Sequence, residues 1–296
     1  MRTARRVVIV CGFTILAVTA TGPAWHGPGH ARATPLACAA LPKDLPAFFL
    51  AGVETIAHCS QDPDLFRLPA QPELRDGEVP EHFMDLELLE GADLPPTRYA
   101  FVQLCAGKNL KPQEVGFVPY AVVEWTQRLT LAFAEHRKWP GNKHVRAKCL
   151  VYAGLLAHYA QDLCQPLHTT IHYDGRAKPD GTSPRSGIHT RVDALLQKTP
   201  VNRDKFIKDT RPVVFDRLLP AVAAELKRSH ALVDRVYELE KQLPELQQPL
   251  PPGSAVEGFA LERLQAAAGF TASLYLTAWR ASAKLELPDW HQRKPR

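Results

Sequence analysis

The apolar residues of this 296-residue chain recur at helical spacing, and no stretch alternates strictly between apolar and polar positions over the length of a strand. The spacing predicts helices over residues 45–58, 113–136, 143–163, 189–197, 204–207 with its flanks, 213–241 and 255–284. Each segment carries an apolar stripe that can pack against its neighbours. Proline-rich stretches separate several of them, and residues 174–186 are typical of a loop. The sequence therefore predicts an all-α fold, a multi-helix bundle in a single domain.

The first 24 residues have the pattern of an export signal. Arg2, Arg5 and Arg6 form a basic start, residues 7–20 an apolar core and residues 21–24 a small-residue end. The core is shorter than an ordinary membrane-spanning helix, and no later segment is apolar for long enough to span a bilayer. We therefore expect residues 1–24 to be a signal peptide and residues 25–296 to form one exported domain, periplasmic or extracellular. A competing cleavage site follows Ala33.

Charge and cysteine content narrow the picture only a little. The net charge is +5, and without residues 1–24 it falls to +2 because 33 basic and 31 acidic residues remain. Such a balance does not by itself point to nucleic acid or to an anionic membrane. Five cysteines remain, which allows at most two disulfides, and the absence of a Cys-x-x-Cys pair argues against a thiolate zinc site. The sequence predicts no protein partner.

Two His-x-x-x-Asp pairs carry the strongest chemical signal. His158 and Asp162 are four residues apart, and His189 and Asp193 repeat the spacing, so each pair lies on one face of its predicted helix. His168 follows a Gln-Pro step that should end the first of these helices and fold the chain back. Imidazole nitrogen and carboxylate oxygen are ligands that suit zinc. The sequence therefore predicts a metal site.

Further potential ligands precede these pairs. The full order along the chain is Trp25, His30, Asp64, His82, His158, Asp162, His168, His189 and Asp193. This order resembles the zinc-dependent phospholipase C and single-strand-specific nuclease superfamily, and the resemblance covers essentially all of residues 25–296. It implies an all-helical domain with three zinc ions in a cleft, and hydrolysis of a phosphodiester by a metal-activated hydroxide that attacks phosphorus.

The resemblance also implies how the ligands divide among the ions. One ion would be held by His82, His158 and Asp162, with Asp64 reaching the same ion or its bound water. A second ion would be held by Trp25 and His30 and would share Asp162 with the first. The third ion would be held by His168, His189 and Asp193. Trp25 would bind through its amino nitrogen and carbonyl oxygen once cleavage exposes it. Cleavage after Ala33 would remove Trp25 and His30, and with them one ion site.

The resemblance assigns roles to four residues near these ligands. Asp64 would orient or deprotonate the attacking water, with Asp62 as a competitor for that role. Arg67 would bind the phosphate, because a guanidinium can bind it through two hydrogen bonds. Phe83 and Asp85 match residues that stack on and hydrogen-bond a base in the nuclease branch, although the same motif also occurs in the phospholipase branch.

Three functions remain open at this point. The resemblance is nearer to the nuclease branch in Asp64-x-x-Arg67, in Gln165-Pro-Leu-His168 and in the aspartate at position 193, which implies a nuclease that acts on single-stranded DNA or RNA. The alternative is a phospholipase C that cleaves a phospholipid headgroup phosphodiester, and the third is a zinc-binding protein without catalysis.

Two departures from the family pattern are expected to alter the walls of the cleft. Gln161 stands where glycine is usual, and Gly187-Ile188 replaces Asn-Leu. We expect the histidines outside the ligand order to be ordinary surface or core residues, with His172 the one that could support a ligand. These are His26, His58, His136, His144, His172, His230 and His291.

Overall fold

The computed structural model describes residues 27–292. Within that range the secondary structure is helical, with two isolated β-bridges and no extended strand, so the all-α prediction is confirmed. The predicted signal peptide and Trp25 lie outside the described residues. No helix between residues 27 and 292 is both long enough and apolar enough to cross a membrane.

The α-helices are α1 (Gly27–Ala39), α2 (Ala47–Ala51), α3 (Val53–Cys59), α4 (Asp62–Phe66), α5 (Pro72–Glu78), α6 (Arg98–Gly107), α7 (Pro112–Val115), α8 (Val118–Lys138), α9 (Lys143–Asp162), α10 (Ile188–Asp193), α11 (Leu195–Lys198), α12 (Arg203–Asp209), α13 (Leu218–His230), α14 (Val233–Leu239) and α15 (Ala255–Ser282). Short 3-10 helices are η1 (Val79–His82), η2 (Leu86–Leu89), η3 (Pro166–His168) and η4 (Glu240–Gln242).

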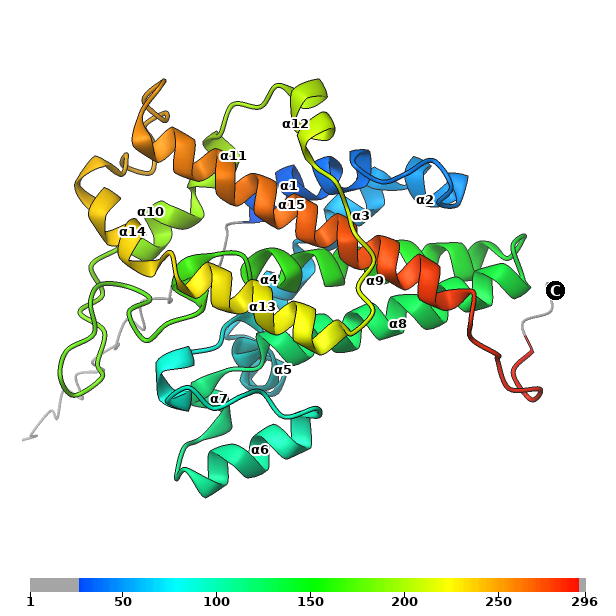
Figure 1. Ribbon diagram of the computed structural model, residues 1–296, viewed down its shortest axis with the longest axis horizontal. Helices are drawn as coiled ribbons and strands as arrows, with labels where there is room; N and C mark the ends of the chain where they lie inside the picture. Colours follow the sequence, from blue (N-terminus) through cyan, green and yellow to red (C-terminus); the bar gives the residue numbers. More distant parts are fainter. Residues whose placement is uncertain (1–26, 293–296) are drawn as a thin grey trace, which may run out of the picture.

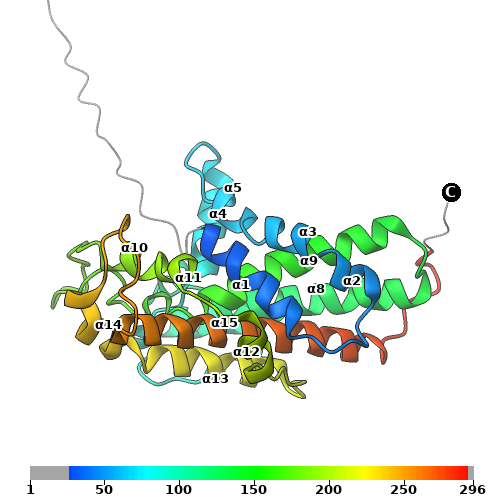
Figure 2. The same ribbon diagram turned by 90° about the horizontal axis from the view of Figure 1, so that it is seen from above.

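Three long helices, α8, α9 and α15, form the centre of the bundle (Figure 1). The helices α1 and α3 pack on α9, and α1 also packs on α15 (Figure 2). Buried aromatic rings join α2 to the central helices. Phe49 on α2 makes edge contacts with Phe133 on α8 and Tyr275 on α15, at 5.2 and 5.4 Å between ring centroids. The Tyr275 hydroxyl donates to the Ala153 carbonyl at 2.7 Å, so even the polar tip of this buried ring is satisfied.

Three of the predicted helices agree closely with the structure, whereas four others are each divided into two shorter helices. The predictions 143–163, 204–207 and 255–284 correspond to α9, α12 and α15. The predicted helix 45–58 breaks at Gly52, 113–136 breaks at Gly116, and 189–197 breaks at Ala194. The loop predicted over residues 174–186 contains no helix.

The fourth broken prediction, 213–241, is wrong at both its start and its middle. Residues 213–217 are not helical. The amides of Val213 and Phe215 donate to the hydroxyls of Ser273 and Thr277 on α15, at 3.1 and 3.0 Å. A helix that started at residue 213 would leave these two amides without intrahelical acceptors, and the hydroxyls satisfy them in a non-helical conformation. The helical part divides into α13 and α14.

A close approach of α3 to α9 is made possible by Gly154. A Cβ atom built there would lie 2.5 Å from Cys59 Cβ and 2.8 Å from the Ile56 carbonyl oxygen, distances that no side chain can occupy. This approach brings Ser60, which follows α3 directly, to the part of α9 that carries His158.

We predict that Gly154→Ala lowers the free energy of unfolding by about 1–3 kcal/mol, because the added methyl must push α3 away from α9. The matched control is Gly258→Ala on α15, where an added Cβ meets nothing within 4 Å. That substitution should raise stability by up to about 1 kcal/mol through helix propensity. Denaturant unfolding measures both, and equal effects would contradict the packing argument.

Candidate metal centre

Three groups of side chains bring histidine nitrogens and carboxylate oxygens within 4.8 Å of one another. They are His30, Asp64 and His158; His82, His158 and Asp162; and His168, His189 and Asp193. The last two groups have the composition that the resemblance implies. The first differs, because Asp64 and His158 accompany His30. All the predicted ligands that lie within the described residues take part, and Trp25 lies outside them.

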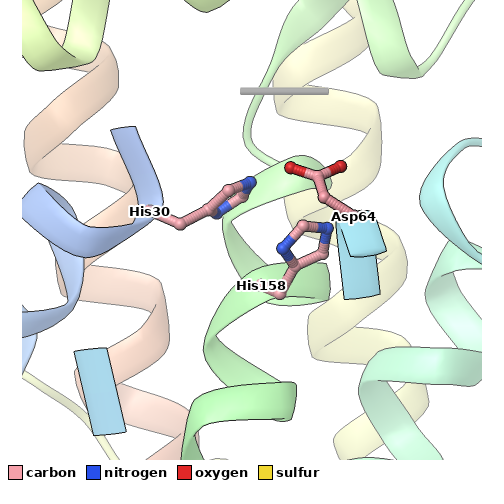
Figure 3. Close-up of side chains that lie close together, drawn as sticks. All are labelled: His30, Asp64 and His158. Carbon is pink, nitrogen blue, oxygen red and sulfur yellow. The ribbon is translucent and has the colours of Figure 1, made fainter. Parts of the chain in front are cut away.

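The ligands come from short segments around the end of α9. His158 and Asp162 occupy the last turns of α9, one turn apart, and His168 ends the 3-10 helix η3 that follows Pro166. His189 and Asp193 lie one turn apart on α10. Further potential ligands come from α1, α4 and η1, which supply His30, Asp64 and His82. Figure 3 shows His30 and Asp64 beside His158.

Asp162 is the centre of this arrangement. Its carboxylate is fully buried and lies 2.9 Å from His82 Nδ1 and 3.2 Å from His158 Nε2. Longer approaches join it to His30 Nε2 at 3.4 Å and to His168 Nδ1 at 3.6 Å. Although burial opposes its charged form, His158 and His168 hold the pKa of Asp162 well below its usual range. Asp162 is therefore an anion inside the protein that needs cationic partners.

Three histidines are held in one tautomer by the backbone. His158, His168 and His189 each have Nδ1 within hydrogen-bond distance of a carbonyl oxygen. The acceptors are the carbonyls of Ser60, His82 and Tyr173, at 2.8, 2.9 and 3.0 Å. Because a carbonyl only accepts, Nδ1 carries the proton in the neutral ring and Nε2 keeps its lone pair. Such bonds orient histidine ligands in metal sites.

His82 is turned the other way round. Its Nδ1 faces Asp162, and its Nε2 lies 3.3 Å from Glu78 Oε1, which also accepts a hydrogen bond from the Tyr159 hydroxyl. Sequence reasoning missed Glu78. The signal that could have found it is its position four residues before His82, at the end of α5.

The third group is built around a stacked pair of rings. The centroids of His168 and His189 are 5.0 Å apart with an interplanar angle of 17°. Asp193 lies 3.2 Å from His189 Nε2 and receives a hydrogen bond of 2.7 Å from the Gln165 amide. Burial and the neighbouring His189 lower the pKa of His168 to about 4, so its ring is neutral at physiological pH.

Buried polar atoms without hydrogen bonds concentrate in these groups. Within the described residues nine such side-chain atoms occur, and six of them belong to the ligand groups. These six are His30 Nε2, Asp64 Oδ2, His82 Nε2, Asp162 Oδ1, His168 Nε2 and Asp193 Oδ2. Each buried polar atom without a partner costs about 1–3 kcal/mol. Five of these atoms lie among the ligand side chains, whereas His82 Nε2 faces Glu78. Cations bound in the three groups would satisfy these five, so the residues fit a metal centre.

Asp64 lies beside His30 and His158 and is partly exposed (Figure 3). Its side chain is 12% exposed, and it forms an ion pair with Arg67, which is 16% exposed, whereas Asp162 is fully buried. Asp62, on the same helix α4, belongs to none of the three groups. The structure therefore brings Asp64 and Arg67 together where a solute could reach them.

Phe83 and Asp85 lie on a segment held beside the third group. Between them, the Met84 amide donates to the His168 carbonyl at 2.9 Å, and the Asp85 amide donates to the Val115 carbonyl at 2.8 Å. Gly116 makes this possible: its φ is +98°, and a Cβ there would lie 2.1 Å from the Phe83 carbonyl oxygen. Burial and the neighbouring Glu87 raise the pKa of Asp85 to about 8.

The histidines that we expected outside the ligand order belong to none of the three groups where the structure describes them. His58 and His144 are exposed, and His172 Nδ1 accepts a hydrogen bond of 2.9 Å from the Ala177 amide rather than facing a ligand group. The five described cysteines are all buried and free, so neither of the two possible disulfides is present among them.

Comparison with known proteins gives a distant structural match. Neither a protein-family model nor a curated protein matches the chain. One similar solved structure is Alpha Toxin from Clostridium Absonum, with a TM-score of 0.46 and 16% sequence identity. The match covers 88% of this chain and 66% of the toxin chain, so this chain spans less than the toxin's full length.

We predict that added Zn²⁺ raises the unfolding temperature of the chelator-treated protein. At free zinc about 100-fold above the dissociation constant, a single ion adds about 2.7 kcal/mol, or roughly 5 °C. Asp162→Asn should remove most of this shift, because a neutral amide cannot replace the central anion. Asp62→Asn is the matched control and should keep it. An equal shift in both variants would mean that zinc binds elsewhere.

Proposed function

We propose that this protein is a zinc-dependent phosphodiester hydrolase whose centre holds three ions. The observation that carries the proposal is the convergence of three ligand groups whose buried polar atoms lack hydrogen bonds. The proposed ligand sets are the ones that the resemblance implies: His82, His158 and Asp162 with Asp64; Trp25 and His30 with Asp162; and His168, His189 and Asp193. Export of the chain, with cleavage after Ala24, is part of the proposal because it exposes Trp25.

The donor set favours zinc. Five histidines and three aspartates from the described residues supply nitrogen and oxygen in comparable measure, and no thiolate joins the groups. Bound zinc would supply Lewis acidity and lower the pKa of a water molecule.

Besides the metal ions, the proposed reaction needs a group that accepts a proton from water and a group that binds phosphate. We assign these roles to Asp64 and Arg67. The partly exposed Asp64 carboxylate would orient a water and accept its proton. Arg67 is paired with Asp64 and can turn its guanidinium to a phosphate oxygen when an anionic substrate arrives, because the pair is partly exposed. Both residues exceed what zinc storage alone requires, which is the reason to prefer an enzyme.

One candidate substrate is single-stranded nucleic acid. Phe83 is half-buried and precedes Met84, whose amide donates to the His168 carbonyl, so an unpaired base that stacked on its ring would lie close to the centre. With its pKa raised to about 8, Asp85 is largely protonated at neutral pH and can donate as well as accept a hydrogen bond at a base edge.

The second candidate is a phospholipid. Three exposed leucines follow Asp64 closely. Leu65 on α4 is 57% exposed, Leu68 between α4 and α5 is 50% exposed, and Leu74 on α5 is 48% exposed. Figure 2 shows that α4 and α5 project from the bundle. Exposed apolar side chains next to a phosphodiester site suit contact with acyl chains.

A paired assay decides between the two substrates. The protein from the exported fraction, with its N-terminus sequenced, is tested on single-stranded DNA, RNA and phosphatidylcholine, with and without chelator. We expect chelator-sensitive release of phosphate esters from one class. Cleavage of nucleic acid alone selects the nuclease, and lipid hydrolysis alone selects the phospholipase C. Zinc binding with inactivity on all three would contradict both and favour the non-catalytic alternative.

Asp64→Asn tests the proposed role of this carboxylate. The amide keeps the size of the side chain but cannot accept the proton, so we expect kcat to fall by at least about 100-fold. Zinc content, measured by atomic emission, should remain largely unchanged. Asp62→Asn is the control on the same helix and should keep activity. Full activity of Asp64→Asn would remove Asp64 from the mechanism.

A further inference from the structure

Gln161 replaces the glycine that is usual at its position, and the structure gives its side chain a specific place. The side chain is fully buried between α9 and α1. Its amide oxygen lies 2.8 Å from His30 Nδ1, and its amide nitrogen donates to the Thr34 hydroxyl at 3.0 Å. His30 and Thr34 are four residues apart on α1, so one amide on α9 bridges two positions on the same helical face.

We infer that Gln161 is a positioning residue for the proposed metal centre: it holds His30 in the tautomer that is protonated on Nδ1, with the Nε2 lone pair directed at Asp162. The inference rests on the proposed function in one respect only, that His30 is a metal ligand. The tautomer itself is a property of the protein without metal.

The geometry shows why His30 needs this support. The rings of His158, His168 and His189 donate from Nδ1 to backbone carbonyls, which can only accept. His30 Nδ1 instead lies against the side-chain amide of Gln161, and its Nε2 faces the Asp162 carboxylate, which competes for the ring proton. Asp162 Oδ1 lies 3.4 Å from His30 Nε2 and attracts a proton to that nitrogen. The amide oxygen of Gln161, at Nδ1, favours the opposite tautomer.

Thr34 holds the other end of the Gln161 amide. With its nitrogen donating to the Thr34 hydroxyl, the amide presents its oxygen to His30. A ring with the proton on Nε2 would present N–H to the centre and could not bind a cation there. Removal of such supporting hydrogen bonds typically weakens metal binding about 10–100-fold.

Nitrogen-15 NMR of the exported, chelator-treated protein tests the tautomer directly. At about pH 8 a neutral histidine ring gives different shifts for its protonated and unprotonated nitrogens. Disappearance of the signals in His30→Asn assigns them. We expect protonated Nδ1 in the wild type and in Gln161→Glu, whose carboxylate also accepts. In Gln161→Met, of similar volume but without an acceptor, we expect the proton to move to Nε2, toward Asp162.

Competition with a chromogenic zinc chelator provides the second readout. Gln161→Met should weaken one of the zinc-binding constants about 10–100-fold, and Gln161→Glu should restore it. The control for general destabilisation is Thr271→Val on α15, which loses a buried hydrogen bond to the Ala267 carbonyl. It should lower the unfolding temperature and leave every zinc-binding constant unchanged.

The outcomes separate the inference from the proposed function. A wild-type ring protonated on Nε2, or the same tautomer in Gln161→Met as in the wild type, would overturn the role of Gln161. Unchanged zinc affinity in Gln161→Met would also overturn it and leave only a packing role. If the wild-type protein bound no zinc while its tautomer was as expected, the proposed metal function would fail and the tautomer assignment would stand.

Discussion

The structure depends on one buried anion. Asp162 is fully enclosed at the end of α9, and a carboxylate in that environment costs several kcal/mol unless cationic groups surround it. Four imidazole nitrogens lie within 3.6 Å of it, and they come from four different elements: α1, η1, α9 and η3. The fold is therefore organised so that segments distant in the sequence meet at one carboxylate. The adjoining pair of His189 and Asp193 extends the same chemistry onto α10.

Packing and chemistry are coupled through α9. Gly154 allows α3 to approach α9 closely, and the Ser60 carbonyl just after α3 then fixes the ring of His158. The loop after α9 returns as η3, so that the His168 carbonyl anchors the segment carrying Phe83 and Asp85. Elements that stabilise the bundle thus also orient the side chains of the centre. In His158 and His189, Nδ1 is held by a backbone carbonyl and Nε2 faces an aspartate.

Much of this could be predicted from the chain alone, for physical reasons. Spacing of four residues places His158 with Asp162 and His189 with Asp193 on single helical faces, whatever the tertiary fold. Apolar periodicity found α9 and α15, but it could not show that Gly116 would break a helix, since that break is needed for contact with the Phe83 carbonyl. It also missed α1, whose Gly27-Pro-Gly29 start is typical of a loop. The supporting roles of Glu78 and Gln161 depend on tertiary contacts that no local pattern encodes.

The central claim is that these side chains bind metal where their unpaired atoms converge. Crystals of the zinc-loaded protein, measured by anomalous diffraction on both sides of the zinc absorption edge, test it most directly. The account predicts anomalous density within coordination distance of Asp162 and His158, and a separate peak between His168, His189 and Asp193. Zinc sites at other places on the protein, with these two groups lacking any peak, would contradict the account.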